Sequence, residues 1–393
     1  MKTKHTDFIL HNVRIMTPGR SDVLGFVHVE NGKFREVGEG DVYHSSPSLV
    51  VIDGQGHKIA PGFIDMHVHG ADGADVMDGT VSSLESIAIF HARHGTTGFL
   101  PTTLTASVAQ LRASMQAARD LQHMSYQGAS VLGVHLEGPF IERSKKGAQN
   151  PDYIQNPAVD AVATLLDGQL DLVKKITIAP DVPNAVDAIA WLTSHGVIAS
   201  LGHSDATYAC AHQAILAGAS HGTHLFNAMR GIHHRDGGLA GACLLHDEVL
   251  CELIADGHHV APEMMQLAFR LKGKDRLALI TDAIAATGKP DGEYQLGGLK
   301  VSVHGEISLL EDGKTLAGST LTMDRAVKNM VEQVGVNLSD ALYMASATPA
   351  NALGFGDCKG QIEQGFDADF VVLDEQLRIV ATYVDGREIY RQR

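Results

Sequence analysis

Cysteine is scarce in this sequence, and no two cysteines form a Cys-x-x-Cys pair. The 393 residues contain four cysteines, scattered at Cys210, Cys243, Cys251 and Cys358. A disulfide framework needs patterned cysteines in an oxidising compartment. We therefore interpret these four as reduced thiols and expect a cytoplasmic protein.

Long apolar segments are also missing from the chain. No run of about 18 apolar residues is present, so we expect no membrane-spanning helix and no membrane partner. Residues 1–7 lead into a short strand-like run and lack the apolar core of a signal peptide. Short repeats and low-complexity segments are absent as well.

Positive charge is in deficit. Lysine and arginine together number 31 against 46 acidic residues, which gives a net charge of −15. This balance disfavours nucleic acid or an anionic membrane as a partner. An anionic small-molecule substrate would need a local basic patch against that field.

Histidine, in contrast, is abundant. The hydrophobic fraction of 44% and the charged fraction of 20% are ordinary for a globular protein, but 22 histidines exceed what packing requires. This excess favours metal binding or acid–base chemistry. The length allows one large domain and a small one.

The two ends of the chain have a strand-rich texture. Residues 1–60 contain short strands, including a hairpin across Asn31-Gly32, and residues 353–393 continue with three more strand candidates. Neither end is large enough to fold alone. We expect both to build one small β-sandwich domain that flanks a central domain of residues 61–352.

The central domain alternates strands and helices. Eight strands with intervening helices over about 250 residues predict an α/β fold of the (β/α)8 TIM-barrel type. Residues 290–318 are glycine-rich and predict a loop, and helices near 322–334 and 338–347 close the barrel. The strand candidates are Phe63–His69, Thr97–Thr102, Ser130–Glu137, Lys175–Pro180, Val197–His203, His221–Phe226, Cys251–Asp256 and Leu277–Asp282.

Polar side chains recur where these strands end. His67 and His69 are two residues apart, so on a strand they point to the same side. Glu137, His203, His224, His259 and Asp282 follow at the ends of other strands. Any one of them could be an ordinary structural residue, but six strands ending this way predict a shared site at the mouth of the barrel.

Imidazole and carboxylate ligands suit Zn²⁺ or Fe²⁺. A divalent ion lowers the pKa of bound water towards 7 and makes a nucleophile available at neutral pH. Asp282 beside that water would carry the proton. Its alternative role is that of a further, permanently ionised metal ligand, and the two roles are compatible.

Seven motifs distributed along the chain support a more specific interpretation. The most specific are His-Leu-Glu-Gly-Pro-Phe at 135–140 and Thr-His-Leu-Phe-Asn-Ala-Met at 223–229. Together the motifs resemble those of the N-acetylglucosamine-6-phosphate deacetylases, a family in the amidohydrolase superfamily. The remaining motifs span 61–70, 202–204, 254–260, 281–283 and 316–323, and the 367–370 tail also fits.

The resemblance implies roles for individual residues. Glu137, His203 and His224 match the metal ligands of the family. Because His67 and His69 are both present, a second metal bridged by Glu137 is plausible, giving one or two ions per subunit. Asp282 matches the catalytic acid–base.

The resemblance also implies substrate contacts. It places Arg235 and His259 on a sugar phosphate, with Arg235 reaching the neighbouring site of a homodimer. Asn227 and Ala228 match sugar contacts. The dense basic segment 229–236 is the candidate phosphate patch, and its alternative is an ordinary solvated loop. A loop beside the acetyl group corresponds to Leu316, Ala317 and Gly318.

One departure concerns Gln149, which follows Ala148 in a segment expected to contact substrate. Some family members have His at the position of Gln149, where it polarises the amide carbonyl. Gln can donate a hydrogen bond but carries no charge. The family has no carboxylated lysine on its fourth strand, and we expect Lys174 and Lys175 to lie at the start of that strand, away from the mouth.

The expected activity is hydrolysis of N-acetyl-D-glucosamine 6-phosphate to D-glucosamine 6-phosphate and acetate, in amino-sugar catabolism. One alternative is the galactosamine epimer. Another is a different amidohydrolase substrate, such as a cyclic amide or an N-acyl amino acid. A third is a catalytically dead relative kept as a scaffold or sensor, which the complete set of candidate ligands disfavours.

Overall fold

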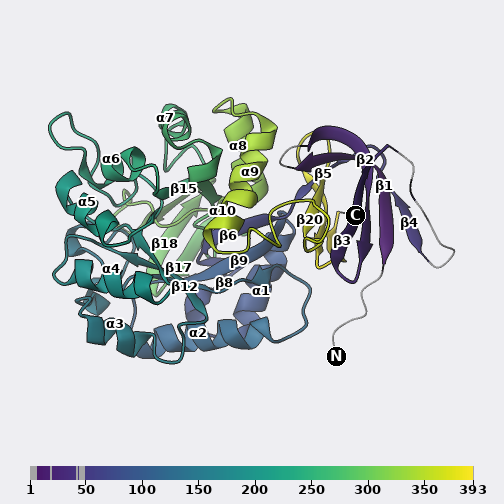
Figure 1. Ribbon diagram of the computed structural model, residues 1–393. Coiled ribbons are helices and arrows are strands. Elements are labelled where there is room, and N and C mark those ends of the chain that lie inside the picture. The colour runs from purple at the N-terminus through teal and green to yellow at the C-terminus, as the bar shows by residue number, and fades with distance from the viewer. Residues whose placement is uncertain (1–6, 18–19, 41–42, 44–48, 393) are drawn as a thin grey trace.

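The computed structural model describes residues 7–17, 20–40, 43 and 49–392. Residues 1–6, where we expect no signal-peptide core, lie outside the described part. Two bodies lie side by side, a large one of strands and helices and a small sheet made by both ends of the chain (Figure 1). No helix in the described ranges has the length and apolar composition needed to cross a bilayer.

The large body is the predicted barrel. Its strands are parallel neighbours in chain order, and a short extra strand, β10 (Ser130–Val131), pairs with β9. Their side chains are buried almost throughout, as expected for a sheet covered on both faces. The eight strands are β6 (Phe63–Val68), β9 (Thr96–Thr103), β11 (Val134–Glu137), β12 (Val173–Ile178), β13 (Ile198–Leu201), β14 (His221–Gly222), β15 (Leu250–Ile254) and β16 (Leu277–Ile280).

Backbone hydrogen bonds close the barrel between its first and last strands. The amides of His69 and Gly70 both donate to the carbonyl of Ala283 over 2.8 Å, and the amide of Asp282 donates to the carbonyl of His67 over 2.9 Å. The closing contacts therefore join His67 directly to the candidate acid–base Asp282, and His69 to its neighbour Ala283.

Helices cover the outside of the barrel (Figure 1). Several begin at a serine or threonine whose hydroxyl accepts a backbone N–H of the first turn, as Ser107 does from Gln110. They are α1 (Val81–Ala92), α2 (Val108–Gln122), α3 (Val159–Leu165), α4 (Ala185–Ser194), α5 (Tyr208–Leu216), α6 (Gly238–Leu245), α7 (Pro262–Lys272), α8 (Met323–Glu332), α9 (Leu338–Ala345) and α10 (Ala347–Ala352).

The two ends of the chain build one sheet, as predicted. Its N-terminal strand β5 pairs with β1 on one side and with β20 from the C-terminal end on the other. The sheet curls around its own core, where Phe370 stacks on Tyr383 with ring centroids 4.4 Å apart and meets Phe34 at 5.8 Å. Its strands are β1 (Phe8–Thr17), β2 (Arg20–Glu30), β3 (Lys33–Glu39), β4 (Val50–Asp53), β5 (Lys58–Pro61), β20 (Phe370–Leu373), β21 (Ile379–Val384) and β22 (Arg387–Arg391).

The predicted loop at 290–318 is wrong. This segment contains a three-stranded antiparallel sheet of β17 (Gly292–Leu296), β18 (Leu299–His304) and β19 (Ile307–Leu310). Gly297 and Gly298 have positive φ and form the tight turn between β17 and β18, so these glycines join a hairpin. Inward-facing apolar residues pack against Leu104 and Ala317, which fixes this sheet beside the barrel mouth.

Candidate metal centre and active site

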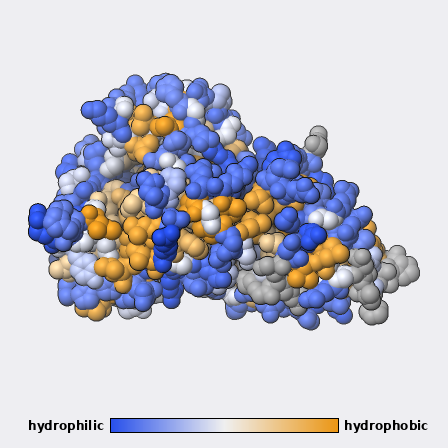
Figure 2. All heavy atoms as spheres, turned by 90° about the horizontal axis from the view of Figure 1, so that it is seen from above, coloured by the Kyte–Doolittle hydropathy of each residue, from blue (hydrophilic) through white to orange (hydrophobic). Residues whose placement is uncertain are grey.

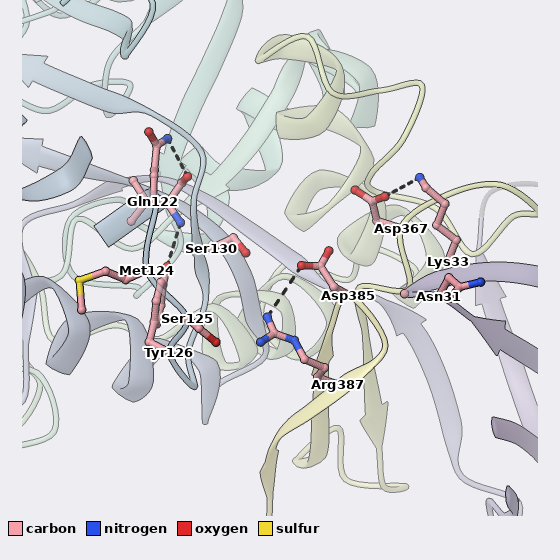
Figure 3. A pocket seen from close by; sticks show the side chains of 13 residues that line it. Asn31, Lys33, Gln122, Met124, Ser125, Tyr126, Ser130, Asp367, Asp385 and Arg387 are labelled. Atoms are coloured by element: carbon pink, nitrogen blue, oxygen red, sulfur yellow. Dashed lines mark hydrogen bonds and ion pairs between the residues drawn. The ribbon is translucent and has the colours of Figure 1, made fainter. Parts of the chain in front are cut away.

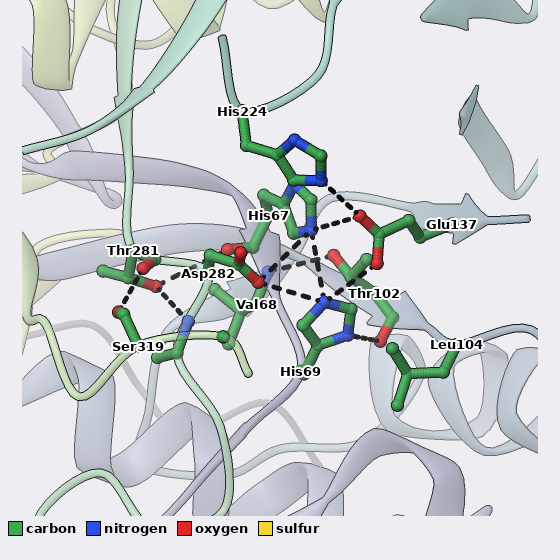
Figure 4. Close-up of polar contacts among 12 residues, drawn as sticks. His67, Val68, His69, Thr102, Leu104, Glu137, His224, Thr281, Asp282 and Ser319 are labelled. Atoms are coloured by element: carbon green, nitrogen blue, oxygen red, sulfur yellow. Dashed lines mark hydrogen bonds and ion pairs between the residues drawn. The ribbon is translucent and has the colours of Figure 1, made fainter. Parts of the chain in front are cut away.

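Four imidazoles converge on the carboxylate of Glu137, the last residue of β11. The Oε1 atom of Glu137 lies 2.9 Å from Nε2 of His224, 3.1 Å from Nε2 of His203 and 3.4 Å from Nε2 of His67. Its Oε2 atom lies 3.3 Å from Nε2 of His69. All five side chains are almost completely buried, and Figure 4 shows His67, His69 and His224 around the carboxylate.

These residues form two groups that could each hold a metal ion, and Glu137 belongs to both. One group is His67, His69 and Glu137, and the other is Glu137, His203 and His224. In each group the ligand atoms lie within 4.8 Å of one another. The geometry matches two half-sites bridged by one carboxylate.

The other ring nitrogen of three imidazoles fixes which tautomer is present. Nδ1 of His69 lies 3.0 Å from the carbonyl of Thr102, and Nδ1 of His203 lies 2.8 Å from the carbonyl of Lys145. A carbonyl only accepts, so each Nδ1 carries a proton, and in the neutral ring each Nε2 presents its lone pair to the site. Nδ1 of His67 lies 3.1 Å from a carboxylate oxygen of Glu252 and has the same orientation.

Lone pairs that face one another need a cation between them. Nε2 of His67 lies 3.2 Å from Nε2 of His69, and Nε2 of His203 lies 3.1 Å from Nε2 of His224. Each pair also faces an oxygen of Glu137, which is itself an acceptor. Imidazole nitrogen and carboxylate oxygen in this arrangement fit a divalent metal at each half-site.

The electrostatics of the cluster lead to the same conclusion. Burial disfavours charged imidazole, yet Asp282 and Glu137 raise the pKa of His67 to about 9 and that of His69 to about 10. Burial opposes ionisation of Glu137 too, but His67 and His203 hold its pKa well below the usual range. The carboxylates therefore demand positive charge, which either protons or metal ions can supply, and metal binding would release protons.

Asp282 completes the floor of the site. It follows β16, and its Oδ1 atom lies 3.1 Å from Nε2 of His69 and 3.6 Å from Nε2 of His67. Although burial alone would raise the pKa of Asp282, His67 and His69 lower it, so the side chain is a carboxylate able to accept a proton.

Three of the converging residues have unusual backbone conformations. The φ angles of His203, His224 and Asp282 are 48°, 31° and 53°, in the left-handed region that residues with a Cβ rarely adopt. Such strain persists only where the surrounding structure imposes it, and it concentrates at functional sites.

A cavity of about 440 Å³ opens above this cluster. Seven of the nine substrate contacts predicted from the sequence line it. The other two do not. Ala317 is buried in the core behind the cavity, and Arg235 is exposed on a loop, with its Nη1 atom 2.7 Å from Nε2 of His234. The seven lining residues are Ala148, Gln149, Asn227, Ala228, His259, Leu316 and Gly318.

Sequence reasoning missed two cations at this cavity. Lys145 and Lys314 both line it. Lys145 belongs to the basic run Arg143-Ser144-Lys145-Lys146, which follows β11 closely. That run is the signal in the sequence that indicates positive charge near this strand end.

Gln149 bonds to the bridging carboxylate. Its amide Nε2 donates to Oε2 of Glu137 over 2.5 Å, and its Oε1 accepts from the amide of Thr105 over 2.6 Å. Both ends of the amide are thus held, and Gln149 fixes the orientation of Glu137 from the cavity side.

Lys174 and Lys175 lie near the start of β12 and neither lines the cavity at the mouth, but Lys175 is connected to the site through Glu252. Lys174 is partly exposed, with its Nζ over the ring of Phe355. Lys175 points into the barrel, where it is fully buried and paired with Glu252, the residue that contacts His67. Burial disfavours the carboxylate of Glu252, but Lys175 and His67 bring its pKa down to about 2.

A second hollow, of about 380 Å³, lies between the terminal sheet and the barrel (Figure 3). Its charged side chains are engaged with each other, since Lys33 lies 2.7 Å from Asp367 and Arg387 lies 3.8 Å from Asp385. Within the described residues, both groups of metal-ligating side chains belong to the Glu137 cluster. The chemistry therefore belongs to the cavity at the barrel mouth.

Comparison with known proteins identifies the class. The family model described as the amidohydrolase family matches residues 59–389. The chain belongs to this family. Amidohydrolases typically depend on a divalent metal, in agreement with the ligand groups described above.

Within the family, the chain is similar to deacetylases of phosphorylated amino sugars. It is 40% identical to the N-acetylglucosamine-6-phosphate deacetylase of Lysinibacillus sphaericus over 96% of this chain and 97% of the relative. It is 39% identical to an N-acetylgalactosamine-6-phosphate deacetylase of Escherichia coli O157:H7, over 84% and 87%. A mutant deacetylase from Mycobacterium smegmatis, solved with N-acetyl-D-glucosamine-6-phosphate, superposes with a TM-score of 0.89 at 33% identity, covering 98% of this chain and 99% of that one.

The two half-sites predict a metal count that a single substitution changes. Replacing His67→Ala removes one ligand of the His67, His69 and Glu137 group and leaves the other group intact. We expect the purified protein to fall from two metal ions per chain to one, measured by mass spectrometry of the elements. An unchanged metal content would show that the His67 half-site holds no ion.

Proposed function

We propose that this protein hydrolyses the acetamide of N-acetyl-D-glucosamine 6-phosphate, giving D-glucosamine 6-phosphate and acetate. The observation that carries the proposal is the cavity whose floor combines Asp282 with a complete set of imidazole and carboxylate ligands. The relatives reported above, which match nearly the whole chain, support this substrate class.

The chain's own residues account for the proton transfers. A divalent cation held by the ligand groups that share Glu137 would lower the pKa of a water molecule and polarise the substrate carbonyl. Asp282, ionised and within 3.1 Å of His69, accepts the proton of the attacking water and then donates it to the departing amine. Water and amide are consumed, amine and acetate are formed, and Asp282 returns to its starting state.

The donor set supports a proposal for the metal. Each half-site offers two imidazole nitrogens and one carboxylate oxygen, which suits Zn²⁺ or Fe²⁺ better than the harder Mg²⁺ or Ca²⁺. We propose that the two groups, which share Glu137, would hold two such ions per chain. The four cysteines are free thiols, which fits a reducing compartment such as the cytoplasm.

Positive charge at the cavity would hold the phosphate. Lys314 lines it, as does Lys145, whose Nζ also lies 3.2 Å from Asp205. His259, held by a 2.6 Å contact between its Nδ1 and Asp256, faces the same space. Burial lowers the pKa of His259, but Asp256 raises it by more, so its imidazole tends to carry charge. These cations would attract an anionic ligand against a net charge of −15.

Arg235 would complete the phosphate site of a second subunit. It lies on an exposed loop outside its own cavity, close to Ile232, which is 53% exposed. Figure 2, seen from the side of α7 and α8, shows apolar areas among the polar surface. Large exposed apolar side chains on α5, α6 and α7 include Leu216, Leu245 and Leu271. We propose a homodimer in which Arg235 crosses to its partner's cavity.

N-acetyl-D-galactosamine 6-phosphate is a second candidate substrate. The specific support is the 39% identity to the deacetylase of that epimer, close to the 40% for the glucosamine enzyme. The two sugars differ at one hydroxyl, and both carry the same acetamide and phosphate.

Acetate release from N-acetylglucosamine 6-phosphate, its galactosamine epimer and unphosphorylated N-acetylglucosamine tests the substrate directly. We expect the glucosamine phosphate to be turned over best. Replacing Arg235→Ala should raise KM for the phosphorylated sugars by about tenfold or more, because a charge-assisted hydrogen bond is lost. The unphosphorylated sugar should be unaffected; equal increases for all three would show that Arg235 does not contact phosphate.

Replacing Asp282→Asn removes the proton carrier while preserving its shape. We expect a folded, metal-containing protein whose kcat falls by about 10²–10⁴-fold, the usual contribution of general acid–base catalysis. Steady-state kinetics and metal content of the same sample check this. Turnover close to that of the wild type would remove Asp282 from the reaction.

A further inference from the structure

An ion pair lies in the interior of the barrel, beneath the metal centre. Nζ of Lys175 on β12 bonds to Oε1 of Glu252 on β15, and both side chains are completely excluded from solvent. Lys175 is paired in register with His135, two residues before the position of Glu137. The pair therefore belongs to the layer of side chains directly below the ligands.

Stability alone gives little reason for this pair. Removing two charges from water is expensive, and well-packed apolar residues of similar volume often stabilise an interior as well or better. The other oxygen of the carboxylate explains its presence. Oε2 of Glu252 lies 3.1 Å from Nδ1 of His67 and 3.4 Å from the backbone amide of His224.

His67 differs from the other candidate ligands in this respect. His69 and His203 are oriented by backbone carbonyls, and Nδ1 of His224 has no hydrogen-bond partner among the described residues. Of the four imidazoles, His67 alone has its Nδ1 against a charged side chain. The half-site of His67 is thus the one in which a charged side chain orients a ligand ring.

We infer that Lys175 and Glu252 are positioning residues that set the metal affinity of the half-site formed by His67, His69 and Glu137. The carboxylate of Glu252 keeps the proton of His67 on Nδ1, fixes the ring and raises the basicity of Nε2. Lys175 holds Oε1, so that Oε2 stays on His67 and its charge is balanced. The half-site of Glu137, His203 and His224 depends much less on the pair.

The test measures metal binding and not turnover. Metal-free wild-type protein and a Glu252→Gln variant are titrated with Zn²⁺ in competition with a chromophoric chelator. We expect two ions per wild-type chain. In the variant, one of the two should bind about 10–100-fold more weakly, the usual effect of losing such a partner, and the other should be unchanged.

Two further variants make the result decisive. A Lys175→Met/Glu252→Gln double variant removes both charges and avoids leaving one buried and unpaired, and it should show the same selective loss. Asp369→Asn is the matched control, because Asp369 is also a buried carboxylate paired with a lysine, Lys359, at 2.7 Å, but it lies in the terminal sheet. Both ions should bind to this control as to the wild type.

Other outcomes would overturn the inference. If Glu252→Gln bound both ions as tightly as the wild type, the pair would have no role at the metal site. If both ions weakened equally, or if the control behaved like Glu252→Gln, the pair would be merely structural. The inference rests on the proposed function in one respect, because both require metal ions at Glu137. Failure of the wild type to release acetate would defeat the function without changing the zinc titration.

Discussion

The carboxylate of Glu137, surrounded by inward-facing imidazole nitrogens, is the constraint on which the rest of the site depends. Three of these rings have their outer nitrogen bound to a carbonyl or carboxylate, so the inner nitrogen presents a lone pair to another acceptor. Such an arrangement is favourable only with positive charge among the acceptors. The need for a cation thus comes from the hydrogen bonds around the site, and it would be invisible from the ligand residues alone.

The barrel supplies this arrangement through the positions of its strand ends. Glu137 ends β11, and His69 is held by the same backbone hydrogen bonds that join the first strand to the last. The glycine-turned sheet of β17, β18 and β19 packs beside the mouth and brings Leu296 to the cavity wall. Below, Lys175 and Glu252 connect β12 and β15 to His67. The contacts that close the barrel therefore also hold residues of the site in place.

Local patterns predicted the parts of this structure that depend on local rules. The two-residue spacing of His67 and His69 places both on one side of a strand, and apolar runs separated by helical patterns gave all eight barrel strands. The pairing of Lys175 with Glu252 spans 77 residues, and no local rule relates them. A single acidic residue inside the apolar run of β15 was the only sign. The sheet at 292–310 was predicted as a loop because a glycine-rich segment is typical of loops. The pairing of its strands, which makes its glycines hairpin turns, cannot be seen in the local sequence.

Anomalous X-ray diffraction from crystals grown with Zn²⁺ tests the central claim most directly, because it locates the ion without reference to activity. The account predicts strong anomalous peaks on both sides of Glu137, at about 2.0–2.2 Å from its oxygens and the imidazole nitrogens. One peak should lie with His203 and His224, and the other with His67 and His69. A map with no peak within coordination distance of Glu137 would contradict it.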